Sequence, residues 1–162
     1  MSATQNTPPQ PCLFAGQSGD TVELIRRFDW AASALGPLEQ WPDVLISSTR
    51  LILSSPTPIV LLCGAKGVLI YNDAYAAFAG QRHPEIFGLP AEQAWPEIAE
   101  WNRHVIGMGL SGRSMSQENL YLPLRRPGLQ EDAWMNLYYN PLLDNTGRSH
   151  GMMCIVVETT SQ

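Results

Sequence analysis

The distribution of hydrophobic and polar residues predicts a hairpin that leads directly into a helix. Residues 59–63, Ile-Val-Leu-Leu-Cys, form an unbroken apolar run rich in branched side chains, which is typical of a buried strand. Residues 64–67 include two glycines and predict a tight turn, and residues 68–71 predict the second strand. Asn72 and Asp73 can cap the following helix, because their side-chain oxygens accept hydrogen bonds from a first helical turn. We expect a concave, half-covered sheet that suits a small pocket.

Helical and strand periodicities predict the elements on either side of this hairpin. Apolar residues recur at helical spacing in residues 20–28 and 42–54, which predicts two N-terminal helices. A longer helix is expected at residues 97–110, with a buried face formed by Ile98, Trp101, Val105 and Met108. Further strands are expected at residues 118–124, 133–142 and 151–160. Because strands and helices do not alternate, this order predicts an α+β domain with a five-stranded antiparallel sheet and helices on one side.

The same pattern divides the chain into three parts. Residues 1–19 are rich in Pro, Gln, Ser and Thr, and we expect a disordered tail. Residues 20–55 are expected to form a helical N-terminal extension, within which residues 29–37 are a linker closed by a Gly-Pro break. Residues 56–162 are expected to form the main domain.

Composition and charge exclude several classes of function. The 162 residues are 44% hydrophobic and 15% charged, as in an ordinary single soluble domain. The formal net charge of −5 argues against a nucleic-acid partner and a membrane partner, since both require basic patches. The N-terminus lacks the pattern of a signal peptide, and no apolar run approaches the roughly 20 residues that cross a bilayer. We therefore expect a soluble, cytoplasmic protein.

Motifs of metal binding and catalysis are absent from the sequence. The three cysteines are widely spaced and match neither a zinc site nor a haem-attachment motif. Their odd number favours reduced thiols, and Cys63 and Cys154 are expected to fill the core. The sequence contains no GxSxG, Walker or HExxH motif and no kinase catalytic motif. We expect the domain itself to have no enzymatic activity.

Short motifs in the hairpin and in the closing strands have counterparts in a known family. They are Tyr71-Asn-Asp-Ala-Tyr75, Gly88-Leu-Pro90, Tyr139-Asn-Pro-Leu142, Asp144-Asn-Thr-Gly147 and Glu158-Thr-Thr160. Over about residues 56–160 the pattern resembles the PAS domain, a sensor fold of bacterial signalling proteins. The upstream segment with Asp29-Trp30, Leu35-Gly-Pro-Leu38 and Trp41-Pro42 looks like the extension that precedes PAS domains in certain sensor histidine kinases.

The resemblance implies a non-catalytic sensory module of a two-component signal-transduction protein. Such a module dimerises, binds a small ligand between sheet and helices, and passes a signal to a kinase or another output domain, in cis or in trans. We expect Glu158 and Thr160 to relay the signal, with Glu158 pairing with Arg125 or a nearby backbone group. The sequence leaves open whether the chain is part of a longer kinase or a stand-alone protein. It also leaves open the ligand, the occupancy of the pocket and the output.

Aromatic and methionine side chains are the candidates for a ligand pocket. Helical and strand spacing predicts a pocket lined by Tyr71, Trp95, Trp101, His104, Met108 and Tyr139. Trp and Tyr have polar tips that orient a ligand in an apolar cavity. The alternative is that these side chains simply fill the core, since close packing is the default in protein interiors.

The resembled family includes branches with two different cofactors. Its blue-light branch carries a reactive cysteine after the first helix, whereas residues 79–84 here are Ala-Gly-Gln-Arg-His-Pro, so we expect no flavin. Its haem branch ligates iron through a histidine on the long helix. His104 lies on that helix, so a haem-binding sensor with His104 as axial ligand is the alternative function. His83 and His150 lie in expected loops and should face solvent. We predict no other cofactor.

The long strand at residues 133–142 carries bulky side chains on both faces. Met135, Leu137 and Tyr139 alternate with residues that include Trp134 and Tyr138. The face with Trp134 and Tyr138 must be covered, either by the N-terminal helices or by a second subunit. We expect a homodimer built from the outer face of the sheet and the N-terminal helices.

Overall fold

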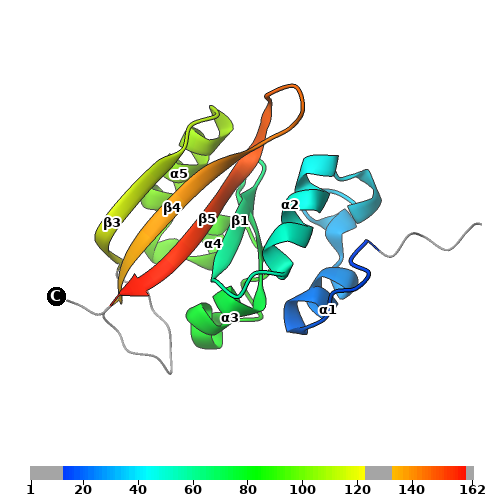
Figure 1. Cartoon of the computed structure of the whole chain (residues 1–162), viewed down its shortest axis with the longest axis horizontal. Coiled ribbons are helices and arrows are strands. Elements are labelled where there is room, and N and C mark those ends of the chain that lie inside the picture. Colours follow the sequence, from blue (N-terminus) through cyan, green and yellow to red (C-terminus); the bar gives the residue numbers. More distant parts are fainter. Residues whose placement is uncertain (1–12, 123–132, 160–162) are drawn as a thin grey trace, which may run out of the picture.

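The computed structural model describes residues 13–122 and 133–159, and its centre is a five-stranded antiparallel sheet. The strands lie in the order β2-β1-β5-β4-β3 (Figure 1). Their bounds are Ile59–Cys63 for β1, Val68–Tyr71 for β2, Met115–Leu122 for β3, Ala133–Leu143 for β4 and Ser149–Thr159 for β5. The predicted α+β class and the five-stranded antiparallel sheet are confirmed.

Helices lie on both sides of this sheet. The α-helices are α1 Asp20–Arg27, α2 Asp43–Leu53, α3 Asp73–Ala79, α4 Ala91–Ala94 and α5 Ala99–Leu110. Short 3₁₀ helices are η1 Trp30–Ala32, η2 Leu38–Gln40, η3 Gly80–Arg82 and η4 Pro96–Ile98. Helix α5 packs against β4 and β5, whereas α2 contacts β1, β2 and the far end of β4 (Figure 1). The two N-terminal helices are present as predicted.

The β1–β2 hairpin has the predicted boundaries, and every residue in both strands is buried. Its turn uses Gly64 and Gly67 at φ +72° and +61°, a left-handed region that favours glycine. A Cβ at Gly67 would lie 2.4 Å from Cδ1 of Ile106 on α5. The second glycine therefore serves both the turn and the close approach of α5.

Asn72 joins this hairpin to the helices around it. Its Oδ1 accepts hydrogen bonds from the backbone N–H of Tyr75 at 2.9 Å and of Ile59 at 3.3 Å. Its Nδ2 donates to the carbonyl oxygens of Ile52 at 2.9 Å and Thr57 at 2.8 Å. The side chain is only 1% exposed. The predicted helix cap is thus also the link between the end of α2, the start of β1 and α3.

The segment predicted to be a linker is instead part of the core. Trp30 is 3% exposed and donates its indole N–H to the carbonyl of Ile25 at 2.9 Å. Its ring centroid lies 4.3 Å from that of Phe28 and 4.9 Å from that of Trp41. Aromatic clusters of this kind bury large apolar areas. The linker prediction was wrong because these rings come together only when η1 folds back over α1.

The tail predicted to be disordered, residues 1–19, includes residues that belong to the folded domain. Phe14 is 1% exposed, and Gln17 donates its amide to the carbonyl of Arg50 at 2.8 Å. Arg50 in turn donates to the carbonyl of Leu13. Residues 13–19 therefore belong to the folded part, held by contacts with α2, and residues 1–12 of the predicted tail lie outside the described residues. The other domain boundaries stay predictions.

Helix α5 presents a different face to the sheet from the predicted one. Its buried residues are Asn102, Val105, Ile106 and Gly109, whereas Trp101 and Met108 are only half-buried. A Cβ at Gly109 would lie 2.9 Å from the Cβ of Met152, so the helix approaches β5 through its glycine. Glycine has no apolar side chain, so the spacing of apolar residues did not indicate that Gly109 lies on the buried face. The predicted buried face is therefore offset from the observed one by about one residue.

Two strand ends also differ from the prediction. β3 begins at Met115, three residues before the predicted start, and residues 123–124 lie outside the described residues. A register shift lies between Gln117 and Leu120, where Asn119 adopts φ +54°. Such a bulge breaks the alternation on which strand prediction depends.

Candidate functional site

A small cavity lies between the sheet and helices α3 to α5. Its apolar floor consists of sheet residues that include Val60, Leu62, Met135 and Leu137. The space open to the centre of a water molecule is about 40 Å³. At roughly 10–15 Å³ for each water, this is room for about three waters or a molecule of only a few atoms, and it is smaller than the roughly 150 Å³ of a cavity that holds benzene. Among the residues that the structure describes, none in the lining carries a formal charge at neutral pH.

Aromatic side chains with polar tips, from the helical side and from β4, line the rest of the cavity. Trp95 donates its indole N–H to the Tyr75 hydroxyl at 3.1 Å. Trp101 donates its indole N–H to the Tyr139 hydroxyl at 3.0 Å. Burial raises the pKa of Tyr139 well above its ordinary value, which keeps the hydroxyl neutral. These two pairs fix the aromatic rings in place.

Asn102 is the remaining polar side chain in the lining. It is 7% exposed and lies on the buried face of α5. Sequence reasoning missed Asn102 because the predicted face of α5 was displaced. Its position three residues before Val105 was the signal that could have found it.

Three of the six predicted pocket residues line this cavity, namely Trp95, Trp101 and Tyr139. Tyr71 and Met108 are outside the lining. Tyr71 is fully buried elsewhere, with its hydroxyl 2.7 Å from Nδ1 of His83. Desolvation, with smaller contributions from Tyr75, Asp20 and Glu85, raises the pKa of Tyr71 above its ordinary value.

His104 does not face the cavity. It is exposed, and its ring centroid is 6.2 Å from that of Trp101. An axial haem ligand must point into the space that holds the iron. The prediction of His104 as a pocket residue was therefore wrong. The physical reason is the rotation of α5, which places Asn102 inward and His104 outward.

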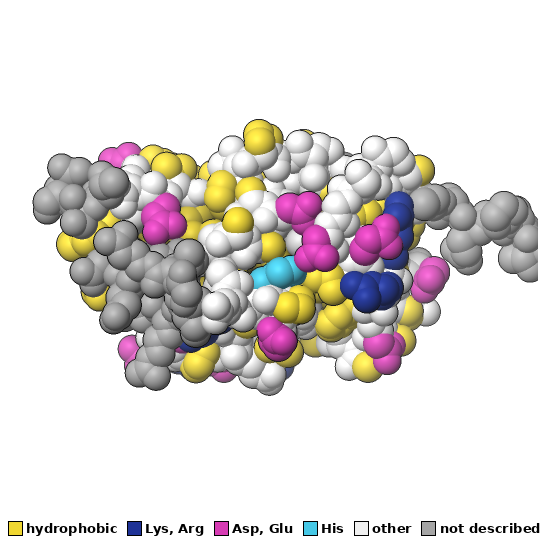
Figure 2. Space-filling model, turned by 90° about the horizontal axis from the view of Figure 1, so that it is seen from below, with side chains coloured by type: hydrophobic (Ala, Val, Ile, Leu, Met, Phe, Trp, Pro, Cys, Tyr) yellow, Lys and Arg dark blue, Asp and Glu magenta, His cyan; other side chains and the backbone are white. Residues whose placement is uncertain are grey.

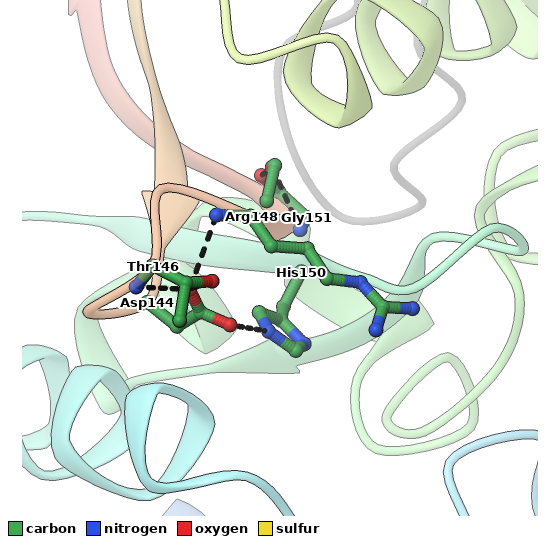
Figure 3. Close-up of polar contacts among 6 residues, drawn as sticks. Asp144, Thr146, Arg148, His150 and Gly151 are labelled. Carbon is green, nitrogen blue, oxygen red and sulfur yellow. Dashed lines mark hydrogen bonds and ion pairs between the residues drawn. The ribbon is translucent and has the colours of Figure 1, made fainter.

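The two histidines expected in solvent are also hydrogen-bonded. His83 bridges the Tyr71 hydroxyl and Oδ2 of Asp20, at 2.7 Å each, and its side chain is 13% exposed. His150 lies 2.8 Å from Oδ2 of Asp144 in the β4–β5 turn (Figure 3). Asp20 is distant in sequence from His83, and Asp144 lies across a turn from His150, so the sequence pattern did not indicate these hydrogen bonds.

Asp144 organises that turn. Its Oδ1 accepts hydrogen bonds from the backbone N–H and hydroxyl of Thr146 and from the backbone N–H of Arg148 (Figure 3). The bonds from Thr146 and His150 lower the pKa of the carboxyl group below its ordinary value. The predicted turn at residues 144–147 is confirmed, and its role is structural.

The predicted signal relay is described only in part. Glu158 lies exposed near the end of β5, in register with Met135 of the cavity floor. Arg125 and Thr160 lie outside the described residues. The relay stays a prediction.

The outer face of the sheet carries a partly exposed apolar patch. It comprises Tyr121, Trp134, Tyr138, Ile155 and Val157, which we call the outer patch. The Tyr121 and Trp134 rings are 5.4 Å apart, and Tyr121 and Val157 remain 42% and 41% exposed. Helix α2 contacts β1, β2 and β4, while Trp134, Tyr138 and Ile155 of the outer patch remain half-buried.

Clusters of charged or metal-binding side chains are a further kind of candidate site among the described residues. On the face shown in Figure 2, acidic and hydrophobic side chains are interspersed, and the visible Lys and Arg side chains gather mainly toward the end with α1. Over residues 13–122 and 133–159, no group of three His, Cys, Asp or Glu side chains could hold a metal ion. No helix in these ranges is both long and apolar enough to cross a bilayer. Cys63 and Cys154 are buried free thiols, and burial raises the pKa of Cys154 to about 12.

Comparison with known proteins finds similarity in shape rather than in sequence. No protein-family model matches the chain, and no curated protein matches it. The PAS domain of Bordetella pertussis BvgS is 19% identical with a TM-score of 0.52, over 75% of this chain and 90% of that domain. The Rhodobacter sphaeroides LOV protein is 14% identical with a TM-score of 0.55, over 74% of this chain and 69% of that protein.

A phage VqmA in complex with DPO is 18% identical with a TM-score of 0.53, over 73% of this chain and 54% of VqmA. The chain thus spans about half of the length of VqmA. Identities this low establish shape alone. Together with the antiparallel sheet in the order β2-β1-β5-β4-β3 and the helices over the cavity, they show that this chain has the PAS fold.

Proposed function

We propose that this chain is a sensory domain that binds a small ligand in the cavity between the sheet and α3 to α5. The observation that carries this proposal is an uncharged cavity with aromatic walls and a small number of polar groups, an arrangement typical of ligand sites. The matches to the BvgS PAS domain and to VqmA in complex with DPO support it. We further propose a cytoplasmic signalling protein of the sensor-kinase type as the setting.

Ligand binding can be tested with the tryptophans of the cavity. Trp95 and Trp101 both line it, so an occupant should change their fluorescence and raise the melting temperature. Native mass spectrometry of freshly purified protein should reveal a co-purified small molecule. A protein that carries none, and whose fluorescence responds to no member of a small-molecule library, would contradict the proposal.

We also propose that the outer patch forms the interface of a homodimer. Exposed apolar patches on sheet faces commonly mark interfaces, and the patch combines three aromatic rings with two branched side chains. Light scattering at micromolar concentration should give twice the chain mass of 17.9 kDa. Val157→Glu should yield the monomer, because it buries a charge in an apolar contact.

A matched control for this experiment lies on the other side of the sheet. Leu110 at the end of α5 is 38% exposed, close to the 41% of Val157. Leu110→Glu should leave the mass at the dimer value. A wild-type monomer, or equal dissociation by both variants, would contradict the outer-patch interface.

We also propose that Glu158 relays the signal, as the sequence predicts. The support for this proposal is that Glu158 pairs in register with Met135, which lines the cavity. We propose that ligand binding changes the environment of residues 157–159. Ligand-dependent NMR shifts of these amides should shrink in Glu158→Ala, and unchanged shifts would place the relay elsewhere.

A further inference from the structure

The size of the cavity between the sheet and α3 to α5 limits what can enter it. The space open to the centre of a water molecule is about 40 Å³. Since one water needs roughly 10–15 Å³, this space holds about three or four heavy atoms. A cavity that holds benzene is several times larger, at roughly 150 Å³. A ligand that fits the cavity as it stands therefore has only a few heavy atoms.

Two hydrogen bonds between aromatic side chains hold the cavity at this size. Trp95 donates its indole N–H to the hydroxyl of Tyr75 on α3 at 3.1 Å. Trp101 on α5 donates its indole N–H to the hydroxyl of Tyr139 on β4 at 3.0 Å. All four rings line the cavity, and each pair joins segments that are far apart in sequence. The rings therefore cannot move apart without the loss of a hydrogen bond, which costs free energy.

The same two pairs leave mainly apolar surface for an occupant. The hydroxyls of Tyr75 and Tyr139 already accept the indole N–H groups, and the Tyr139 hydroxyl is also hydrogen-bonded to the thiol of Cys154. Among the other described residues of the lining, only Asn102 is polar. A buried water needs about two to four polar partners, whereas apolar cavities stay dry and bind apolar guests. The lining thus favours an apolar occupant over water.

We propose that the cavity binds an uncharged, apolar molecule of about three heavy atoms, in the size range of a dissolved gas or a short hydrocarbon, and that the two aromatic pairs exclude larger ligands. This inference rests on the proposed ligand-binding function. It adds the class of ligand and the side chains that set its size. A ligand this small reaches a dissociation constant on the order of 1 mM at best.

Three compounds test the size and the polarity of this ligand class separately. Cyclopropane and formamide have equal numbers of heavy atoms, but only cyclopropane is apolar, and benzene is apolar but larger. The measurement is NMR of the methyl groups of Leu62, Leu137 and Val156, which line the cavity. Wild-type protein should bind cyclopropane with a dissociation constant on the order of 1–10 mM, at least about ten times more tightly than formamide, whose polar groups would lose their hydrogen bonds to water. Benzene should show no binding up to its solubility.

Two variants change the cavity in opposite directions. Val156→Phe adds four carbon atoms to the lining, about the capacity of the cavity, and should abolish the binding of cyclopropane. Val44→Phe makes the same change at a half-buried position of α2 outside the lining and should keep the wild-type affinity. Trp101→Ala removes one member of an aromatic pair together with its indole, so this variant should bind benzene.

The outcomes separate this inference from the function on which it rests. If the wild type binds formamide or benzene as tightly as cyclopropane, the ligand class is refuted while the cavity remains a ligand site. If cyclopropane does not bind, or shifts methyl groups outside the lining such as those of Leu61, the ligand class is also refuted, and the library screen described above decides the proposed function separately. A folded Trp101→Ala variant that rejects benzene would refute the role of the aromatic pairs. Should a variant fail to fold, the wild-type preference together with the location of its methyl shifts decides the ligand class.

Discussion

Replacement of Asn72 should destabilise the whole domain, because one buried amide joins three elements. In Asn72→Ala the backbone N–H of Tyr75 loses its acceptor, and the carbonyls of Ile52 and Thr57 lose their donor. Loss of a helix cap costs about 1 kcal/mol. Each buried group left without a partner costs about 1–3 kcal/mol, although the terms do not add fully.

We expect a total loss of about 3–5 kcal/mol from these terms. That is a large part of the roughly 5–15 kcal/mol that stabilises a typical domain. Urea denaturation followed by circular dichroism should show the midpoint falling with an unchanged slope. The exposed Asn145→Ala should change stability by less than about 0.5 kcal/mol.

Asn72→Asp adds a pH test of the same network. The new carboxyl group retains the oxygen that caps α3 but places its second oxygen against the carbonyls of Ile52 and Thr57. Repulsion and burial should raise its pKa in the folded state above the unfolded value of about 3.9. The variant should therefore be most stable below that unfolded value and lose stability as pH rises through the raised folded value.

Two results would refute this reasoning about Asn72. One is a loss below about 1 kcal/mol in Asn72→Ala, which is no more than a simple cap contributes. The other is an Asn72→Asp variant whose stability relative to wild type does not fall between pH 4 and pH 7. Either result would mean that the end of α2 and the start of β1 are held together without this amide.

Further predictions concern α5 and the β4–β5 turn. Gly109→Ala should cost about 1–3 kcal/mol, because its Cβ would lie 2.9 Å from that of Met152. A Cβ at Gly107 on the same helix would meet no atom within 4 Å, so Gly107→Ala should instead stabilise the protein by up to about 1 kcal/mol. Urea titrations that give the two variants equal stability would contradict the packing of α5. The pKa of Asp144 is lowered by its hydrogen bonds, so its stabilising effect is present above the unfolded value near 3.9 and is lost as pH falls through the folded value. Asp144→Asn should therefore flatten the loss of stability below pH 4 in acid titrations, and an unchanged slope would exclude this role.

The sequence by itself determined the parts whose interactions are local. The β1–β2 hairpin pairs residues no more than about eleven positions apart, the Asn72 cap reaches three residues along the chain, and the sequence pattern predicted both correctly. The class of the fold followed from the order of such elements. Trp95, Trp101 and Tyr139 were identified because large aromatic residues between a sheet and helices have few other places to lie.

Only the tertiary structure decided which face of α5 points inward. Asn102 lies on the buried face of this helix and His104 on its exposed face, and the helix approaches β5 closely at Gly109 and Met152, which are far apart in sequence. The partners of His83, Trp30 and Phe14 were hidden for the same reason. The periodicity of apolar residues predicts that a helix has a buried side, but packing against a strand that is distant in sequence fixes the rotation of the helix about its axis. That rotation determines the chemistry of the cavity.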